Sequence, residues 1–135
     1  MASDEYVLDA PAASTALLRK DAVGTAVGRL IEASTCHAPH LIDAEVGNVL
    51  RRHEREGLID PDTATIGLRM LATMVDRRYA HQGWLSEQDW LLRHTITFYD
   101  GLYAALAARL DVPPLTSDAR LSRTPGLPCR VEVID

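Results

Sequence analysis

The sequence predicts an α/β protein, a three-layer α/β/α sandwich built on a short, mainly parallel sheet. Short apolar runs typical of buried strands lie near both ends of the chain. Amphipathic stretches with helical spacing lie between these runs. Strands that are separated by helices, rather than by tight turns, must pair through parallel crossovers. The chain contains no repeats, low-complexity segments or linkers, so residues 1–135 are expected to form a single domain.

The first half of the chain is expected to begin with a strand and continue with helices. Tyr6–Leu8 is a short apolar run that ends at Asp9, and Pro11 suits the first turn of a helix. Cys36–His40 leads into Leu41 and Ile42, which fit either a second short strand or the entrance to the next helix. Helical spacing predicts helices over Ala12–Leu18, Ala22–Ala33 and Asp43–Arg55.

The second half is expected to hold three more helices and two strands. Pro61 opens a long helix whose pattern extends to Arg77. Ser86–Asp89 resembles a capping box, which predicts a short helix that includes Trp90, Leu91 and Leu92. Thr97-x-x-Asp100 is a second capping box and predicts a helix that runs through Leu110. Strands are expected over Val112–Thr116 and Val131–Ile134.

Composition indicates a protein of the reducing cytoplasm. No apolar run approaches the length of roughly 20 residues that a membrane helix needs, and the first residues are acidic, unlike an export signal. Cys36 and Cys129 lie far apart and form no C-x-x-C pair, so the sequence suggests neither a disulfide framework nor a thiolate zinc site. We therefore expect no membrane association.

The net charge of −5 argues at first against a nucleic-acid partner, because phosphate contacts usually come from a basic surface. If four of the nineteen acids surround a metal ion, however, fifteen remain against fourteen basic residues, and the rest of the surface is nearly neutral. All the basic residues except Lys20 are arginines, which suits phosphate recognition. A basic codon bias would produce the same count.

Four carboxylates lie where a metal site could form: Asp9 after the first strand, Glu45 in the third helix, Asp100 at the start of the last helix and Asp118 after Thr116. Ligands in such sheets bind outside the carboxyl ends of the strands, where Asp9 and Asp118 would lie. Each acid also has an ordinary explanation, because the aspartates suit helix caps and Glu45 suits a solvated helix face. Gathered together, the four would repel one another unless a cation neutralised them.

A hard divalent ion is the simplest remedy, and all-oxygen ligands without histidine or cysteine suit Mg²⁺ or Mn²⁺ rather than zinc. Such an ion can activate water toward a phosphodiester without a side-chain nucleophile. The five histidines lack a matched zinc spacing, and the serines lack the context of a hydrolase nucleophile. The sequence also has no glycine-rich phosphate loop.

The chain resembles the PIN-domain family, and within it the VapC type of toxin. The resemblance spans nearly the whole chain, and its specificity lies in the order and separation of four stretches: VLDA at 7–10, APHLIDAEVGNVL at 38–50, TFYDGLYAALA at 97–107 and LTSDARL at 115–121. It implies that Asp9, Glu45, Asp100 and Asp118 form a magnesium-binding active site. Asn48 and Thr116 match positions that support the acids by hydrogen bonding.

The resemblance further implies an endoribonuclease toxin that cleaves RNA, assembles as a homodimer and is neutralised by a cognate antitoxin lying over a groove near the first helices. One departure affects the site. The family usually has a small hydroxyl residue two places after the first acid, where this chain has Pro11, which lacks both a hydroxyl and an N–H group. Ser14 or Ser117 could substitute for that hydroxyl, and we therefore include Ser117 among the supporting residues.

Two other functions fit the residues less well. A PIN-like module that Pro11 has weakened catalytically could instead bind an antitoxin or RNA without cleavage. A phosphatase with an aspartyl nucleophile at Asp9 would need a second acid at position 11, where proline stands. Metal-dependent RNA cleavage is therefore the leading hypothesis.

Overall fold

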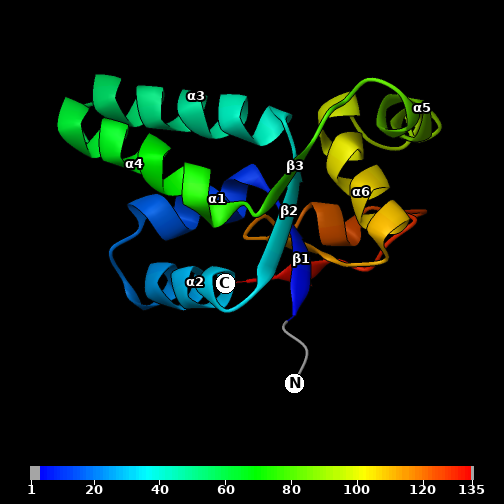
Figure 1. The fold of residues 1–135 in the computed structure, drawn as a ribbon, viewed down its shortest axis with the longest axis horizontal. Coiled ribbons are helices and arrows are strands. Elements are labelled where there is room, and N and C mark those ends of the chain that lie inside the picture. Colours follow the sequence, from blue (N-terminus) through cyan, green and yellow to red (C-terminus); the bar gives the residue numbers. More distant parts are fainter. Residues whose placement is uncertain (1–3, 135) are drawn as a thin grey trace.

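A five-stranded parallel sheet lies between two layers of helices, as the sequence predicts (Figure 1). The computed structural model describes residues 4–134. The strand order is β3-β2-β1-β4-β5. The strands are β1 (Glu5–Leu8), β2 (Thr35–Pro39), β3 (Arg77–Tyr79), β4 (Pro114–Thr116) and β5 (Glu132–Val133). The helices are α1 (Ala10–Leu18), α2 (Ala22–Glu32), α3 (Leu41–Arg55), α4 (Pro61–Met74), α5 (Trp84–Trp90) and α6 (Phe98–Leu110), followed by a 3₁₀ turn at Leu121–Arg123.

Helices α1 to α4 form the layer on one side of the sheet, and α5 and α6 form the layer on the other (Figure 1). Within the first layer α1 packs against α2, α3 and α4, while in the second α6 packs against both α5 and the strands β1 and β2. The central strand β1 is therefore covered on both faces. Its last residues Val7 and Leu8 are fully buried, as expected for a strand inside a parallel sheet.

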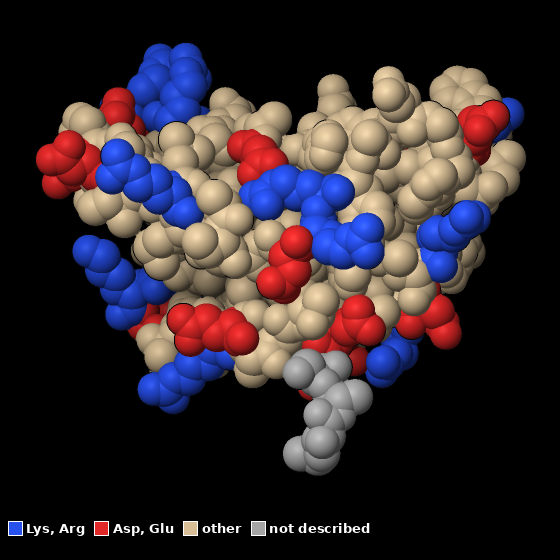
Figure 2. Space-filling view, viewed as in Figure 1, with Lys and Arg blue, Asp and Glu red and all other residues tan. Residues whose placement is uncertain are grey.

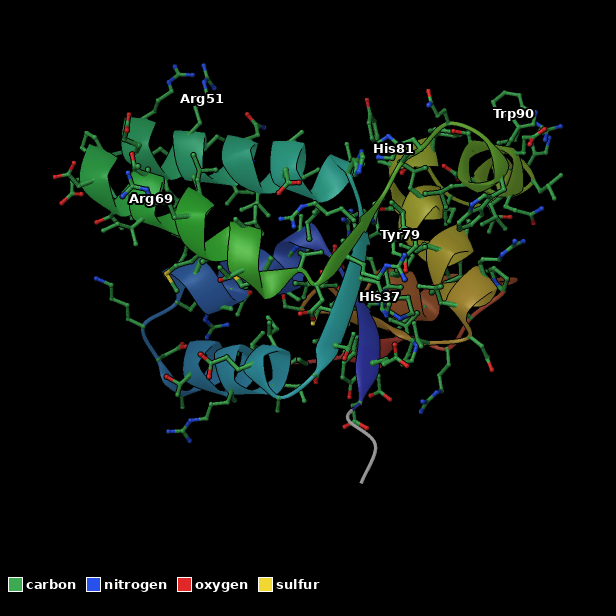
Figure 3. All side chains as sticks on the ribbon, viewed as in Figure 1. His37, Arg51, Arg69, Tyr79, His81 and Trp90 are labelled. Carbon is green, nitrogen blue, oxygen red and sulfur yellow. The ribbon has the colours of Figure 1, made fainter. Side chains whose placement is uncertain are left out.

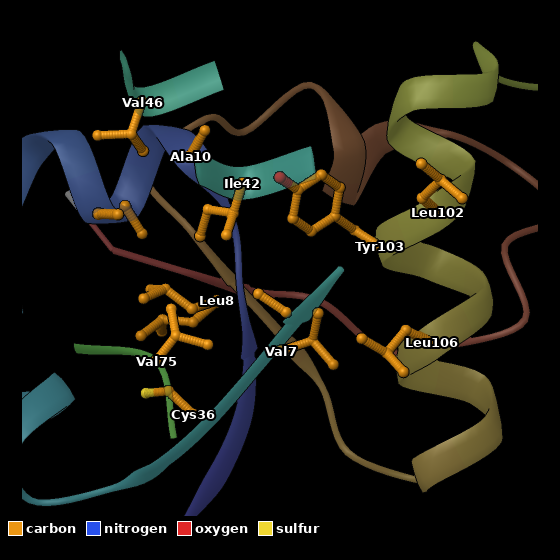
Figure 4. Close-up of a cluster of buried hydrophobic side chains, with 14 of the residues drawn as sticks. Val7, Leu8, Ala10, Cys36, Ile42, Val46, Val75, Leu102, Tyr103 and Leu106 are labelled. Carbon is orange, nitrogen blue, oxygen red and sulfur yellow. The ribbon is translucent and has the colours of Figure 1, made fainter. Parts of the chain in front are cut away.

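The hydrophobic core extends from the sheet into both helix layers. Close to β1 it includes Ile42 and Val46 of α3 on one side and Leu102 and Leu106 of α6 on the other (Figure 4). Leucine, isoleucine and valine dominate the fully buried side chains, each of which contributes about 1.5–3 kcal/mol by leaving water. This packing fixes α3 and α6 relative to the end of β1.

Several expected elements differ from the observed ones. Leu41 and Ile42 belong to helix α3, which settles the open alternative for that segment. The long helix that was expected to reach Arg77 ends at Met74, and Arg77–Tyr79 instead pairs with β2 as an edge strand that the sequence did not reveal. The Ser86 capping box was wrong, because α5 begins at Trp84 and the Ser86 hydroxyl donates to the carbonyl of His81.

On the face shown in Figure 2, arginines and acids alternate and neither forms a continuous patch. Arg78 on β3, for example, pairs with Asp43 of α3 through two hydrogen bonds of 2.7 and 2.9 Å. Among residues 4–134, no helix has the length and hydropathy to cross a bilayer.

Two glycines of α2 offer a matched test of how closely α2 packs against the backbone that precedes it. A Cβ atom on Gly24 would lie 2.1 Å from the carbonyl oxygen of Arg19, whereas one on Gly28 would meet nothing within 4 Å. We expect Gly24→Ala to destabilise the fold by more than about 1 kcal/mol because backbone atoms must move. We expect Gly28→Ala to stabilise it by roughly 0.5–1 kcal/mol through helix propensity. Urea unfolding monitored by circular dichroism measures both changes, and equal effects would contradict the close approach of the Arg19 backbone to α2.

Candidate active site

The candidate site lies at the point in the sheet where the strand order reverses. From β1 the chain crosses to β2 on one side, and β4 later pairs with β1 on the other. In open parallel sheets the crevice outside the strand ends at such a reversal is the usual ligand site. Asp9 directly follows β1, and Asp118 lies two residues after β4. Both acids therefore lie at this crevice, the position predicted for them from the sequence.

Two helices bring the remaining acids to the same place. Glu45 lies one turn into α3, and Asp100 lies in the first turn of α6. All four carboxylates line one cavity of about 610 Å³. Eleven other residues complete the lining: Pro11, Arg93, His94, Thr95, Ile96, Thr97, Tyr103, Thr116, Arg120, Leu121 and Thr124.

Asp9 is the most buried of the four acids. Only 7% of its surface is exposed, and it also serves as the N-cap of α1, since its Oδ1 accepts a 2.9 Å hydrogen bond from the amide of Ala12. Burial raises the pKa of Asp9 to about 7, and the charges of Glu45 and Asp118 act in the same direction. The two hydrogen bonds that it receives, from Thr116 and Ala12, oppose this increase only in part. The fold thus holds a carboxylate where a negative charge is costly.

Thr116, the last residue of β4, links two of the acids. It is fully buried and hydrogen bonds to the Asp9 side chain, and its Oγ1 also accepts a 2.9 Å hydrogen bond from the amide of Asp118. A threonine is suited to both contacts because its hydroxyl can donate and accept. Thr116 therefore contacts two of the acids, and the supporting role expected of it stays a prediction.

Glu45 is held by Tyr103, which projects from α6 toward α3 (Figure 4). The phenol hydroxyl donates to Oε1 of Glu45 at 2.5 Å. Burial raises the pKa of Glu45, the Tyr103 hydrogen bond opposes this, and the charge of Asp100 adds to the increase. Burial together with the neighbouring carboxylate also raises the pKa of Tyr103, so the phenol keeps its proton and remains a donor.

Asp118 has the opposite environment. Its carboxylate accepts hydrogen bonds from the backbone amide of Arg120 at 3.0 Å and from the Arg120 Nε at 2.8 Å. These bonds lower the pKa of Asp118, so this acid is ionised where Asp9 resists ionisation. Asp100 is exposed at the rim of the cavity.

The donor set fits a hard divalent cation in kind and in charge. It offers carboxylate oxygens alone, and two of the acids have raised pKa values that a cation would lower. Within residues 4–134, however, no three acidic, histidine or cysteine side chains approach closely enough to hold an ion as they stand. Glu45 is hydrogen bonded to Tyr103 and Asp118 is paired with Arg120, and both side chains would have to move to share one ion.

The other expected supporting residues lie outside the cavity. Asn48 is exposed on α3 and is not part of the lining. Ser117 accepts a 3.0 Å hydrogen bond from the hydroxyl of Thr15, and the buried hydroxyl of Ser14 has no partner within the described chain. Neither serine therefore replaces, at the cavity, the hydroxyl that Pro11 lacks. Pro11 itself lies at the exposed rim.

Sequence reasoning missed two partners of the acids, Tyr103 and Arg120. Tyr103 lies three residues after Asp100, on the same side of the helix, and this spacing was the available signal. Arg120 lies two residues after Asp118, which is close enough for a local pair. Among so many arginines, nothing in the sequence distinguished this one.

Comparison with known proteins decides the family. The pattern of the PIN domain matches residues 6–127. This chain belongs to the PIN-domain family. Among curated relatives, Ribonuclease VapC1 of Mycobacterium tuberculosis is 47% identical over 131 residues, covering 97% of this chain and 98% of its own. Ribonuclease VapC9 of the same organism is 37% identical and covers 95% and 97%.

Solved structures share the fold of this PIN domain. The VapBC2 complex of Rickettsia felis, bound to a promoter DNA fragment, contains a chain with a TM-score of 0.72 and 14% identity, covering 97% of this chain and 99% of its own. The sarcin–ricin loop cleaving toxin VapC20 of Mycobacterium tuberculosis has a TM-score of 0.68 and 20% identity, covering 98% and 100%. The predicted architecture is therefore confirmed.

The raised pKa of Asp9 predicts a pH-dependent cost to stability in this PIN domain. The folded pKa of about 7 exceeds the ordinary 3.8, so the native state binds more protons than the unfolded chain between these values, and wild-type stability falls as pH rises through that window. Asp9→Asn keeps the helix cap but removes the charge. We expect it to raise the free energy of unfolding at pH 8, by an amount on the order of a few kcal/mol, and much less near pH 5.

Denaturant unfolding in the presence of a chelator, at pH 5 and at pH 8, measures this difference. Asp62→Asn, on the exposed first turn of α4, controls for removing a surface charge. A gain from Asp9→Asn that is equal at both pH values would show that Asp9 is ionised without penalty in the fold.

Proposed function

We propose that this chain is a metal-dependent endoribonuclease toxin. The observation that supports the proposal most strongly is the convergence of four carboxylates, from four separate segments, on one cavity at the sheet reversal. Its similarity to Ribonuclease VapC1 along almost the entire chain supports RNA as the substrate. Mg²⁺ or Mn²⁺ is the proposed cofactor.

Asp9, Asp100 and Asp118 are the proposed metal ligands, and Glu45 completes the set. When bound, the ion would activate water and stabilise the charge that develops on the departing oxygen. The protein's part is to hold the donors. Thr116 orients Asp9 through its hydroxyl, and Tyr103 holds Glu45 in the absence of an ion.

Arginines at the rim would bind the RNA backbone. Arg93 and Arg120 both line the acid cavity, and the Arg120 side chain is about 80% exposed. Guanidinium groups match phosphate oxygens in geometry, and they offset the repulsion between the acids and a polyanion. Arg120 would have to release Asp118 when the metal binds, which would free it to contact a phosphate.

The proposed partner is a cognate antitoxin, and the proposed assembly is a homodimer in the cytoplasm. The similarity to the toxin–antitoxin complex of Rickettsia felis supports the antitoxin. Exposed apolar side chains on α4 and in the loop before it support a protein partner next to the first helices. The exposed residues concerned are Leu58, Ile66, Leu68 and Met70.

A catalytically weak module that binds antitoxin or RNA is the second candidate. Two observations favour it: position 11, where the family usually has a hydroxyl residue, is a proline, and Arg120 already pairs with Asp118. In this case the acid cavity would retain the family geometry but would not hold an ion tightly. Metal binding therefore separates the two candidates.

Removal of one ligand should abolish cleavage. We expect Asp100→Asn to lower the rate of Mn²⁺-dependent cleavage of a fluorogenic single-stranded RNA by more than about 100-fold, the upper end of what the loss of an outer-shell partner costs. Asp62→Asn makes the same change of charge away from the cavity and should cleave at the wild-type rate. Full cleavage by Asp100→Asn, with an unchanged melting curve, would refute the assignment of Asp100.

Metal binding can be measured without RNA. We expect isothermal calorimetry to detect Mn²⁺ binding at millimolar concentration or below, and we expect Asp9→Asn to abolish the heat. Binding should also raise the melting temperature, because the ion stabilises the folded state alone. A wild-type protein that binds no metal at millimolar concentration would favour the second candidate.

A further inference from the structure

An exposed aromatic cluster lies beside the acid cavity. The chain has few aromatic residues: four tyrosines, two tryptophans and one phenylalanine. Three of these seven are exposed close together in sequence, with Trp90 57%, Phe98 40% and Tyr99 62% accessible. Trp90 ends α5, where its ring projects outward (Figure 3), and Phe98 begins α6, two residues before Asp100.

Trp90 and Phe98 line a second cavity. This cavity has a volume of about 660 Å³, and its other lining residues are Ser86 and Glu87. It is a shallow hollow that is widely open to solvent, so a planar ring can lie against its walls without being enclosed. Its walls are largely aromatic, and its charged group is the carboxylate of Glu87. An anionic phosphate would therefore be disfavoured in this cavity, whereas a neutral aromatic ring would be accepted.

Arg93 connects the second cavity with the acid cavity. It lines the acid cavity, and its guanidinium lies over the indole ring of Trp90 at 4.7 Å from the ring centroid. Its Nη1 also donates a 2.8 Å hydrogen bond to the carbonyl of Trp90. The contact orients the indole ring and places a positive charge between an aromatic pocket and a site for phosphodiester chemistry.

We propose that the cavity between Trp90 and Phe98 is a subsite for an unpaired nucleobase of the RNA substrate. The inference rests on the proposed ribonuclease function. The base stacks on the aromatic walls while Arg93 contacts a phosphate of the same strand at the rim of the acid cavity. A base in a duplex is already paired and stacked, so the subsite selects single-stranded segments or loops.

The arrangement of charge favours a nucleobase over a second copy of this chain as the occupant. Arg93 supplies a positive charge between the two cavities, where the strand's phosphates would pass, and Glu87 lies at the exposed edge of the aromatic cavity, where its carboxylate can accept a hydrogen bond from the amino group of a base. A protein interface would not require this separation. Because Arg93 touches both cavities, a strand whose base lies in the aromatic cavity would run past Arg93 toward the acids.

The two tryptophans supply a reporter and a matched control. Trp84 is on the same helix and is also covered by an arginine, Arg109, at 4.9 Å, but it is half-buried and does not line the aromatic cavity. In Trp84→Phe, therefore, Trp90 is the remaining indole. We expect a 12-nucleotide single-stranded RNA to quench its fluorescence, with Ca²⁺ in place of Mn²⁺ and the intact RNA verified on a gel.

Affinity for the same RNA, measured by fluorescence anisotropy, completes the test. We expect Trp90→Ala to weaken binding about tenfold or more, because stacking is lost, and Trp90→Phe to keep most of the affinity. Trp84→Phe should bind as the wild type does. A duplex of the same length should neither quench Trp90 nor compete.

Three results would overturn the proposal: wild-type affinity in Trp90→Ala, an unquenched Trp90 at saturating RNA, or equal competition by the duplex. Light scattering gives a fourth. If Trp90→Ala converts a dimer to a monomer, the cluster is a protein interface instead. When the wild type cleaves RNA with Mn²⁺ but Trp90→Ala binds normally, only the subsite fails. When the wild type neither binds nor cleaves RNA, the ribonuclease proposal fails with it.

Discussion

The burial of the Asp9 carboxylate is the constraint on which the rest of this structure depends. β1 ends inside the molecule, so the residue that follows it is largely shielded from bulk water. The N-terminus of α1 offsets part of the cost, because Asp9 caps the helix and lies at the positive end of its dipole. Thr116 offsets another part with a hydrogen bond. The raised pKa shows that these contributions do not fully offset the cost of burying the charge. A bound cation would offset the remainder.

Each of the other acids meets this electrostatic problem in a different way. Glu45 relies on the phenol of Tyr103, Asp118 on the guanidinium of Arg120, and Asp100 on exposure at the rim. Each of these three acids thus has a partner or solvent exposure of its own, although four carboxylates line the cavity. The same contacts would oppose the proposed metal binding, since Glu45 and Asp118 would have to exchange one partner for another. Under this proposal, stability of the free protein and affinity for the ion compete at these two residues.

The sequence contained enough to predict the layers of the fold and the four acids, because buried strand ends and amphipathic helices are local patterns. It did not contain the edge strand Arg77–Tyr79, which has no apolar run. That strand depends on pairing with β2 and on the ion pair between Arg78 and Asp43 of α3. The start of α5 was hidden for a similar reason, since Gly83 begins the helix with a positive φ of 90° rather than with a capping side chain. Both features are set by tertiary contacts.

The first turn of α6 shows how tightly packing and chemistry are joined. Asp89 of α5 is 1% exposed, its carboxylate has no hydrogen-bond partner within the described residues, and burial with the charge of Asp100 raises its pKa to about 7. It fits there because residue 101 is glycine, since a Cβ at that position would lie 1.6 Å from Oδ1 of Asp89. One turn of helix therefore holds a proposed metal ligand, a wall of the aromatic cavity and the glycine against which α5 packs. A shift of α5 that altered the aromatic cavity would also move Asp89 against Gly101, the residue after Asp100. Binding of a base in that cavity would therefore affect the position of Asp100.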